Sequence, residues 1–296
     1  MIRIKRDCDE PRGLGTARKN HLSKAIAAIA QHGAHSKEFK DTLDGYGSKA
    51  TKERLYLAQK KKCAWCEQSC RFSSNPVDHY RPKDGAWRHL PDNKPETVDK
   101  EHYWWLTWTW TNLYFSCPTC NDQGHKANYF PLVKGTKPIP SPKYPIPNPP
   151  PSRIFDTSGE QPLLLDPADP NVDPLDHIQW IPNFRHLPRA QWVWEPDPIT
   201  VQGDATIRIL KLKELADAVQ DHLKKCVLPS IEEIEKHLGA SPKRLKDARE
   251  RWDKLLANTL APESELSAAT WCALEIWMPA KKRRENGLTE PRRPGS

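Results

Sequence analysis

The stretches CAWCEQSC at residues 63–70 and CPTCN at residues 117–121 decide how this chain folds. Each stretch opens with two cysteines that are two residues apart, and the four cysteines are Cys63, Cys66, Cys117 and Cys120. Two such pairs are a strong signal for zinc, because together they supply four thiolates to one tetrahedral ion. A zinc ion with four protein ligands has no open position, so we expect it to be structural.

The segment clamped between the two cysteine pairs is far longer than a plain zinc ribbon needs, so it must itself be folded. It carries polar residues that suit metal-assisted chemistry, and a further one follows the second pair directly. They are Asp78 and His79 in VDHYRPK, Asn112 in WTNLYFS, and Asn121.

These four residues divide naturally into chemical roles. Asp78 and His79 are neighbours on a predicted strand and therefore point to opposite faces, unless the strand ends and the chain bends there. A carboxylate suits Mg²⁺, and an imidazole can take a proton from water. The amide oxygen of Asn121 can complete the ligands of the ion, and Asn112 can hold the intervening loop by hydrogen bonds to the backbone.

Hydrophobic periodicity places these residues on short elements. Helices are predicted around residues 21–31 and 48–62, the second leading directly into the first cysteine pair. Short strands are predicted at 76–80 and 113–116, and Pro118 suits the first turn of a helix that carries Asn121.

The second half of the chain begins after a proline-rich stretch. Residues 131–152 contain nine prolines, which predicts either an extended connector or a belt on the surface. A proline-rich ligand for a partner is the alternative. Beyond it we predict a strand pair at 177–181 and 191–194, and helices at 203–238, 241–260 and 263–277. The apolar positions of residues 203–238 form one continuous stripe.

Composition indicates a protein without a membrane span. The chain has 296 residues and a mean hydropathy of −0.80, and its first residues lack the apolar run of a signal peptide, which predicts a cytoplasmic location. Its eight cysteines are then expected to be reduced thiols and metal ligands. Cys70, with a C-x3-C spacing from Cys66, is the second choice as a zinc ligand. A net charge of +8 favours a polyanionic partner.

The pattern CAWCE…VDHYRPK…WTNLYFSCPTCN…HK…FP resembles an HNH endonuclease of the ββα-metal type with a zinc-knuckle frame. The resemblance implies that Asp78 and Asn121 bind a catalytic Mg²⁺ or Mn²⁺ and that His79 is the general base. Asn112 then positions the loop that carries the base. Asn121 stands where the name-giving His of the family often stands, and His125, one turn further, is the fallback ligand or a phosphate contact.

A narrower resemblance extends through YWWLTWTWTNLYFSCPTCN, FPL at 130–132 and PLLLDP at 162–167. These stretches are similar to the HNH nuclease subunit of Septu-type anti-phage defence systems, whose relatives accompany some retrons. The resemblance implies an effector nuclease that cuts nucleic acid beside an ABC-type ATPase. We expect DNA more than RNA as the substrate. No G-x4-GK[ST] motif occurs, so any ATP dependence must come from another chain.

Together these patterns predict an α+β protein: a zinc-stapled ββα-metal core with N-terminal helices and a mainly helical C-terminal region. The expected division is a nuclease domain at 1–132, a proline-rich connector at 133–160, a docking region at 161–280 and a disordered basic tail at 281–296. In the docking region Trp180, Trp192 or Trp194 is expected on an exposed face, as an anchor for a partner.

Two other functions fit parts of the same sequence. A zinc-stapled nucleic-acid-binding protein needs the cysteines and the basic charge, but not Asp78, His79 and Asn121 together. A pure interaction protein needs only the tryptophans and the helical half. We expect the tryptophans of residues 104–110 to be core rather than a platform for stacked bases.

Overall fold

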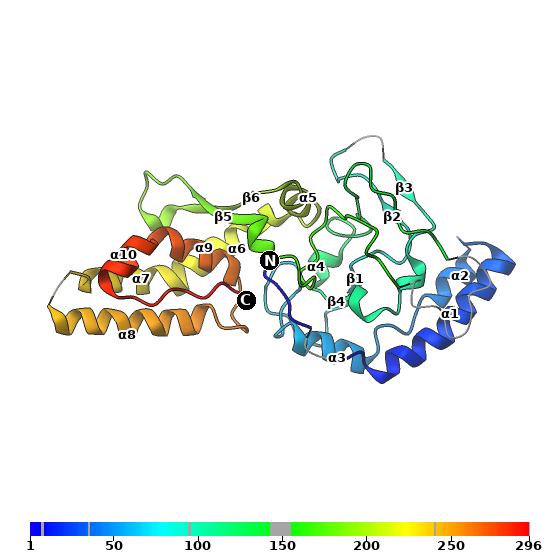
Figure 1. Cartoon of the computed structure of the whole chain (residues 1–296), viewed down its shortest axis with the longest axis horizontal. Coiled ribbons are helices and arrows are strands. Elements are labelled where there is room, and N and C mark those ends of the chain that lie inside the picture. Colours follow the sequence, from blue (N-terminus) through cyan, green and yellow to red (C-terminus); the bar gives the residue numbers. More distant parts are fainter. Residues whose placement is uncertain (7–8, 35, 94–95, 143–154, 240, 296) are drawn as a thin grey trace.

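The computed structural model describes residues 1–6, 9–34, 36–93, 96–142, 155–239 and 241–295. In Figure 1 these residues form two lobes, one built around short strands and N-terminal helices, the other mainly helical. Both ends of the chain lie where the two lobes meet. The combination of helices with small antiparallel sheets confirms the predicted α+β class.

Three helices precede the first cysteine pair. They are α1 (Arg12–His32), α2 (Lys37–Thr42) and α3 (Lys49–Ala58). Helix α1 begins earlier than the periodicity predicted, and α3 begins at the predicted Ser48, whose hydroxyl accepts a hydrogen bond from the Thr51 amide. Helix α3 is tied to the central strands by Gln59, which exchanges side-chain hydrogen bonds with both backbone groups of Phe115.

The centre of the first lobe is a strand pair followed by a short helix. Strand β1 (Val77–His79) runs antiparallel to β4 (Leu113–Phe115), with His79 opposite Leu113 and Val77 opposite Phe115. Helix α4 (Pro118–Asn121) follows β4 directly, and Cys117 caps its first turn. The predicted strands and the predicted helix start at Pro118 are thus confirmed.

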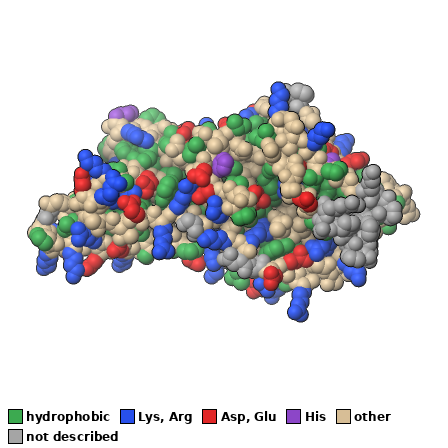
Figure 2. Space-filling view, in the orientation of Figure 1, with side chains coloured by type: hydrophobic (Ala, Val, Ile, Leu, Met, Phe, Trp, Pro, Cys, Tyr) green, Lys and Arg blue, Asp and Glu red, His purple; other side chains and the backbone are tan. Residues whose placement is uncertain are grey.

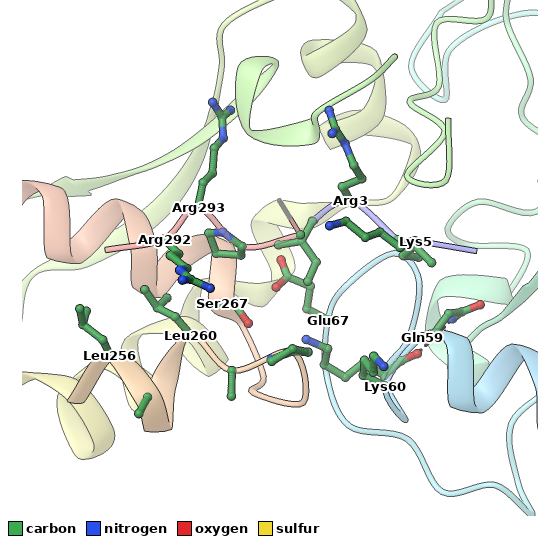
Figure 3. A pocket seen from close by; sticks show the side chains of 18 of the residues that line it. Arg3, Lys5, Gln59, Lys60, Glu67, Leu256, Leu260, Ser267, Arg292 and Arg293 are labelled. Carbon is green, nitrogen blue, oxygen red and sulfur yellow. Dashed lines mark hydrogen bonds between the residues drawn. The ribbon is translucent and has the colours of Figure 1, made fainter. Parts of the chain in front are cut away.

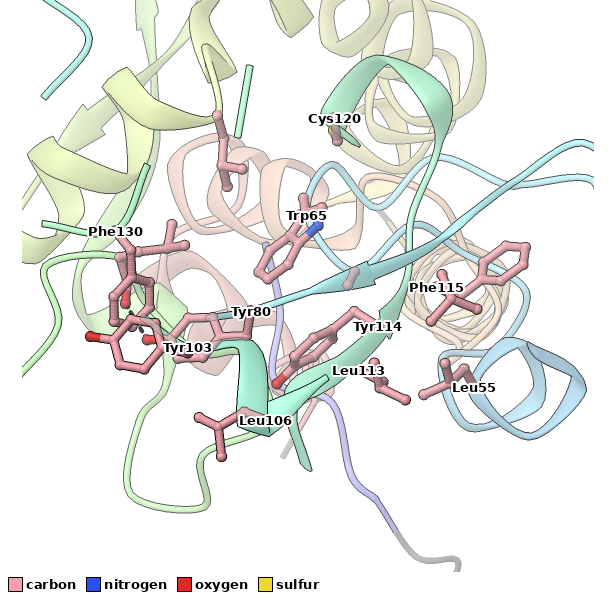
Figure 4. Close-up of a cluster of buried hydrophobic side chains, with 14 of the residues drawn as sticks. Leu55, Trp65, Tyr80, Tyr103, Leu106, Leu113, Tyr114, Phe115, Cys120 and Phe130 are labelled. Carbon is pink, nitrogen blue, oxygen red and sulfur yellow. Dashed lines mark hydrogen bonds between the residues drawn. The ribbon is translucent and has the colours of Figure 1, made fainter. Parts of the chain in front are cut away.

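Aromatic side chains fill the space around this strand pair. Trp65 and Tyr114 pack with ring centroids 5.0 Å apart, and Tyr80 meets Phe130 edge to face at 5.2 Å. Figure 4 shows these rings gathered beside β1 and β4. The tryptophans of residues 104–110 are buried in this core or at its edge, which confirms that they are core residues. Trp104 and Trp105 lie on the 3₁₀ turn η1 (Trp104–Leu106), Trp110 begins η2 (Trp110–Asn112), and Trp108 lies between them. A second small antiparallel pair, β2 (Ala86–Trp87) with β3 (Val98–Asp99), lies within the segment between β1 and β4.

The first core does not end at the proline-rich stretch. Leu164 and Leu165 are buried in it, and the Tyr80 hydroxyl donates to the Leu164 carbonyl at 2.6 Å. Helix α5 (Val201–Ile209) contributes Ile207 and Ile209 to the same core. Residues expected in the docking region therefore complete the lobe that holds the cysteine pairs.

The second lobe has its own core. Its sheet pairs β5 (Ile178–Asn183) with β6 (Val193–Pro198), after the turn η4 (Pro174–Asp176) and with η5 (Arg189–Gln191) between the strands. The helical segments are η6 (Leu212–Leu215), α6 (Ala216–His222), the π-helical η7 (Leu223–Val227), α7 (Leu228–His237), α8 (Pro242–Thr259), α9 (Ser267–Trp277) and α10 (Ala280–Asn286). In the described part of the chain, no helix combines the length and apolar character that crossing a bilayer requires.

Residues 203–238 are helical as predicted, but the prediction of one apolar stripe is wrong. The chain leaves the helical path at Lys211, which has a positive φ of 47°, and continues through a 3₁₀ turn and a π-helical turn. Its apolar stripe is divided as a result: Ile207 and Leu210 belong to the first core, and Val219 belongs to the second. The periodicity shows which residues are buried, but not that two cores share them.

The expectation that Trp180, Trp192 or Trp194 is exposed is also corrected. Trp180 and Trp194 are buried in the second core, and Trp194 packs edge to face on Trp277 with ring centroids 5.5 Å apart. Trp192 is half-buried against the same two rings. The strand pair packs Trp180 and Trp194 against its own helices, so these two side chains are not free to anchor a partner.

The basic tail is ordered where the sequence predicted disorder. Residues 280–286 form α10, and Arg283 is buried, with 3% of its surface exposed. Its guanidinium pairs with Glu275 and Glu290 and donates to the Met278 carbonyl. The Trp252 indole also donates to the Thr289 carbonyl at 2.7 Å. Local composition suggested a solvated end because it does not reveal these distant partners.

The flanks of the predicted connector lie close together. The Val133 amide donates to the Gln161 carbonyl at 2.8 Å, and Leu132 forms a bridge with Pro162. The described flanks of the stretch therefore both lie on the first lobe, where Ile139 and Phe155 pack against its core. The centre of this stretch, residues 143–154, lies outside the described residues.

The ordered tail predicts different effects for two adjacent arginines. Arg283→Ala removes charged hydrogen bonds made in a buried position, so we expect the free energy of unfolding to fall by about 1–3 kcal/mol. Arg284→Ala changes an exposed side chain of the same helix and should alter it by less than about 0.5 kcal/mol. Urea denaturation of the full chain measures both; equal, small effects would contradict an ordered tail.

Candidate active site and zinc-binding cluster

The four cysteines of the two pairs come together as predicted. The sulfur atoms of Cys63, Cys66, Cys117 and Cys120 all lie within 4.8 Å of one another. The Cys66 and Cys117 sulfurs are 3.9 Å apart. A tetrahedral zinc ion with Zn–S bonds of about 2.3 Å requires sulfur–sulfur distances of about 3.8 Å. The cluster therefore has the donors and the size that a structural zinc ion needs.

Backbone amides point at the cluster and favour thiolates there. The Cys117 amide donates to the Cys63 sulfur at 3.3 Å, and the Cys120 amide donates to the Cys117 sulfur at the same distance. Such donors stabilise the negative charge on a metal-bound sulfur. Cys70, the second choice as a ligand, lies outside this group, and its thiol faces the Gln68 carbonyl at 3.5 Å.

A cavity of about 260 Å³ lies beside the end of β1. Three of the residues predicted for catalysis line it, and so do several polar and aromatic neighbours. The three are Asp78, His79 and Asn121, and the neighbours include Tyr46, Lys83, Asp84, Gln123 and Asn128. The structure thus brings Asp78, on β1, and Asn121, on α4, to one space across a long stretch of sequence.

The imidazole of His79 is held in one tautomer. Its Nε2 atom lies 3.0 Å from the Thr107 carbonyl oxygen. A carbonyl can only accept, so Nε2 carries the proton and Nδ1 keeps its lone pair. The Tyr46 ring packs edge-on against the imidazole with centroids 4.4 Å apart. Burial, with the nearby Lys83 ammonium, lowers the pKa of His79 to about 3, so the ring is neutral near pH 7.

The carboxylate of Asp78 is buried and receives several hydrogen bonds. The Trp65 indole donates to Oδ2 at 2.9 Å, and the His79 amide donates to Oδ1 at 2.7 Å. The Lys126 ammonium lies 3.4 Å from Oδ1. Burial raises the pKa of Asp78, while Lys126 and these donors oppose that rise. They hold the carboxylate in a single orientation at the edge of the cavity.

Lys126 is a residue of this site that sequence reasoning missed. It is fully buried, and its ammonium group also donates to the His79 carbonyl. It therefore joins the backbone of β1 to the loop after α4, at the two residues expected to do the chemistry. The signal in the sequence was weak: a lysine five residues after Asn121 in a polar loop does not distinguish a buried cation from a surface one.

Asn112 ties the two sides of the intervening loop together. Its side-chain oxygen accepts from the Arg81 amide at 2.8 Å, and its amide nitrogen donates to the Arg81 carbonyl at 3.0 Å and to the Leu106 carbonyl at 3.3 Å. Arg81 follows His79 by two residues, and Leu106 precedes Thr107, which holds the imidazole. The side chain of Asn112 thus links both segments that position His79.

The oxygen donors of the cavity fit a divalent cation. A carboxylate has about four lone-pair positions, so Asp78 retains room for a metal beside its three donors. Within the described residues the Asn121 side chain makes no hydrogen bond, and its amide oxygen is available in the same cavity. Oxygen atoms of these two kinds are the ligands that Mg²⁺ prefers.

His125, the fallback ligand, is not among the residues that line the cavity. Its Nε2 atom lies 3.2 Å from a carboxylate oxygen of Glu214 on η6. This contact joins the loop after α4 to the start of the helical segments. His125 therefore lies outside the cavity that Asp78 and His79 line.

Comparison with known proteins gives one significant similarity to report. The chain is 26% identical over 181 residues to the Septu protein PtuB of Bacillus mycoides (strain KBAB4). The matched region is 61% of this chain and 55% of that protein, so the chain spans little more than half of the relative. No family model matches the chain, and no solved structure matches it significantly. The predicted resemblance to a Septu protein is confirmed at this level.

The cysteine cluster predicts a tightly bound metal. Purified protein should contain about one zinc ion per chain, because four thiolates satisfy one tetrahedral ion. Cys63→Ser or Cys117→Ser should lose the zinc and misfold, since binding of a structural zinc ion is coupled to folding. Cys70→Ser is the matched control and should retain both zinc and fold. Metal analysis and circular dichroism of the purified variants measure this; zinc-free wild-type protein that folds normally would contradict it.

Proposed function

We propose that the chain is a metal-dependent HNH endonuclease that hydrolyses phosphodiester bonds of nucleic acid, with DNA favoured over RNA. One observation carries the proposal most directly. His79, with its Nδ1 lone pair free by virtue of the Thr107 hydrogen bond, lines the same cavity as Asp78 and Asn121. A neutral base and two oxygen donors in one space are the minimum that metal-assisted phosphodiester hydrolysis needs.

In this proposal His79 acts as the general base. Nδ1 accepts a proton from a water molecule, and the resulting imidazolium keeps its Nε2–H bond to the Thr107 carbonyl. That bond strengthens when the ring becomes charged, so the same carbonyl that selects the tautomer also stabilises the protonated ring. Asn112 acts as a positioning residue, because it holds the backbone on both sides of this interaction.

Asp78 and Asn121 are proposed to hold a Mg²⁺ or Mn²⁺ ion. When bound, such an ion polarises the scissile phosphate and stabilises the leaving oxygen. Trp65 and Lys126 keep the Asp78 carboxylate aimed at the cavity. The role of the zinc cluster would then be purely structural, since its four ligands leave no position for substrate.

The similarity to a Septu protein supports a role in anti-phage defence. We propose that the chain is the effector nuclease of such a system and acts with an ATPase subunit, as the sequence resemblance implies. The chain has no G-x4-GK[ST] motif of its own, so the hydrolysis of ATP is assigned to that subunit. The face seen in Figure 2 shows no continuous basic path for the nucleic acid. In Figure 2 the Lys and Arg side chains are spread over both lobes and mixed with Asp and Glu.

A nucleic-acid-binding or interaction protein without hydrolytic activity is the second candidate. The observation that favours it is the contact between the Lys126 ammonium and the Asp78 carboxylate, which lie 3.4 Å apart. A carboxylate paired with a buried lysine can be purely structural. The two candidates differ in whether nucleic acid is cut, and the next experiment decides between them.

His79→Ala should abolish most of the cleavage activity. Loss of a general base lowers the rate by about 10²–10⁴-fold, while nucleic-acid binding should remain. His125→Ala, the matched control, removes a histidine outside the cavity and should cut like the wild type. Nicking of supercoiled plasmid with Mg²⁺ or Mn²⁺, together with a binding assay, measures both. If the wild type does not cut, or His79→Ala cuts as fast, the proposed mechanism is wrong.

Asn121→Ala should raise the Mg²⁺ concentration needed for half-maximal cleavage, because it removes one proposed oxygen ligand. We expect a shift of about tenfold or more, the lower end of what loss of a group near a metal costs. Gln123→Ala changes another amide that lines the same cavity and should leave the Mg²⁺ requirement unchanged. A metal titration of plasmid cleavage compares the two variants; equal midpoints would exclude Asn121 as a ligand.

The partner is proposed to dock on the helical lobe through the loop between β5 and β6. Phe184 and Leu187 in this loop are exposed, Phe184 to 54%, although both are large apolar side chains. Phe184→Asp with Leu187→Asp should abolish co-purification with the ATPase subunit of the same system without unfolding the chain. Leu57→Asp, an equally exposed leucine on the first lobe, is the control. If the double variant still co-purifies with the ATPase, the docking surface lies elsewhere.

A further inference from the structure

A second, larger cavity lies where the two lobes meet. Its volume is about 540 Å³, within the range of about 300–1,000 Å³ that is usual for sites of small organic ligands. The N-terminal segment, the end of α3 with the first cysteine pair, the end of α8 and the segment after α10 all line it. We call this space the interlobe cleft. It is separate from the candidate active site, since the residues that line the two cavities do not overlap.

The charged residues of the interlobe cleft are unbalanced. Six cationic side chains line it, against three carboxylates: Arg3, Lys5, Lys60, Lys62, Arg292 and Arg293 against Glu67, Asp253 and Glu290.

All three carboxylates already have partners. Glu67 binds the Met1 amino group and the Ala268 amide, and Glu290 binds Arg283. Asp253 accepts a hydrogen bond from the Thr289 hydroxyl. Glu67 and Glu290 are therefore paired with cations that do not line the cleft, and Asp253 is the one carboxylate of the three whose printed partner is neutral.

The six cations divide into three that are bonded to protein oxygens and three that are not. Arg3, Lys62 and Arg293 are bonded to carbonyl or carboxylate oxygens of the protein. Among the described residues, by contrast, Lys5, Lys60 and Arg292 are in no ion pair or side-chain hydrogen bond. Figure 3 shows Lys5 and Arg292 extending from the two terminal segments toward the space in front of Glu67. The cleft thus presents uncompensated positive charge from three different parts of the chain.

One wall of the cleft is apolar. Leu256 and Leu260 on the last turns of α8 contribute to it, with the small side chains of Ala257 and Ala261 beside them. Ile2 and Ile4 add apolar surface from the N-terminal segment. A site with charged groups on one side and aliphatic groups on the other suits a ligand that has an anionic end and an organic body.

We propose that the interlobe cleft binds a small organic polyphosphate of nucleotide size. Its phosphates would lie among Lys5, Lys60 and Arg292, whose guanidinium and ammonium groups suit phosphate oxygens. Its organic part would lie against the aliphatic end of α8. The cavity volume matches a single nucleotide rather than a polymer, which is why we assign the site to a free ligand and not to the nucleic acid that is cut.

Backbone contacts connect the interlobe cleft to the candidate active site, so a ligand bound in the cleft would act on that site. Cys63 and Ala64 line the cleft, and the Ala64 amide donates to the Phe115 carbonyl on β4 at 3.1 Å. Strand β4 in turn pairs with β1, which carries Asp78 and His79. The binding site itself does not depend on the proposed nuclease activity, so it can be tested by binding alone.

Isothermal titration calorimetry of the full-length, zinc-loaded protein tests the proposal. The probes are ATP, ADP, tripolyphosphate and inorganic phosphate, without added divalent metal. We expect ATP and ADP to bind with micromolar Kd, and inorganic phosphate to bind at least tenfold more weakly. Lys5→Ala with Arg292→Ala should weaken ATP binding at least tenfold. Lys24→Ala with Arg244→Ala removes two exposed cations outside the cleft and should leave the Kd unchanged.

A second variant tests the same site without changing the terminal segments, in case Lys5 and Arg292 are needed for folding. Ala257→Glu adds a carboxylate to the exposed helical wall without removing a cation, and it should also weaken ATP binding at least tenfold. The proposal is overturned if ATP and ADP do not bind at millimolar concentrations, or if all variants bind as tightly as the wild type. Binding of a single-stranded DNA oligonucleotide that depends on Lys5 and Arg292, with no binding of ATP, would also overturn it and assign the cleft to the substrate.

Discussion

The closure of the four-cysteine cluster is the constraint on which the first lobe depends. It brings the residues around Cys63 and Cys66 against those around Cys117 and Cys120, with all sulfurs within 4.8 Å of one another. This fixes the loop after α3 beside the start of α4. The strands β1 and β4, which lie inside the closed segment, pair in a single register as a result. A chain with so few residues in strands gains much of its order from such a cross-link, because three-residue strands are not stable alone.

The parts of this site that the sequence predicted are those encoded by neighbouring residues. The spacing within each cysteine pair predicted the four-cysteine cluster, and the short apolar runs predicted β1 and β4. The chemistry of Asp78, His79 and Asn121 indicated a metal-assisted site, and the structure places all three around one cavity. Each of these predictions depended on a local pattern with a clear physical meaning, and none required knowledge of how distant segments pack.

The parts that the sequence did not predict all depend on distant partners. Lys126 is buried because Asp78, 48 residues away, offers a carboxylate, and no local pattern shows that. Arg283 is buried because Glu275 and Glu290 surround it, so a run of charges that looks solvated becomes part of a core. The apolar stripe after residue 203 divides between two cores beyond Leu212, just after the positive φ of Lys211 turns the chain. Periodicity reports burial, but it does not identify the surface against which a residue is buried.

The proline-rich stretch is joined to the candidate active site by a buried ion pair. Arg81, two residues after His79, binds Glu160 at 2.9 Å, and both side chains are nearly inaccessible. Burying two charges is costly unless their remaining hydrogen-bonding groups are satisfied. Here the Tyr103 hydroxyl and the Ile139 amide also donate to Glu160, at 2.5 Å and 2.9 Å. Removing the Glu160 carboxylate would leave the Arg81 guanidinium buried without its counter-ion, and Arg81 is the residue whose backbone amide and carbonyl are both bonded to Asn112. The two flanks of the proline-rich stretch are therefore part of the framework that positions His79, and a change in either flank acts on the loop that carries the proposed base.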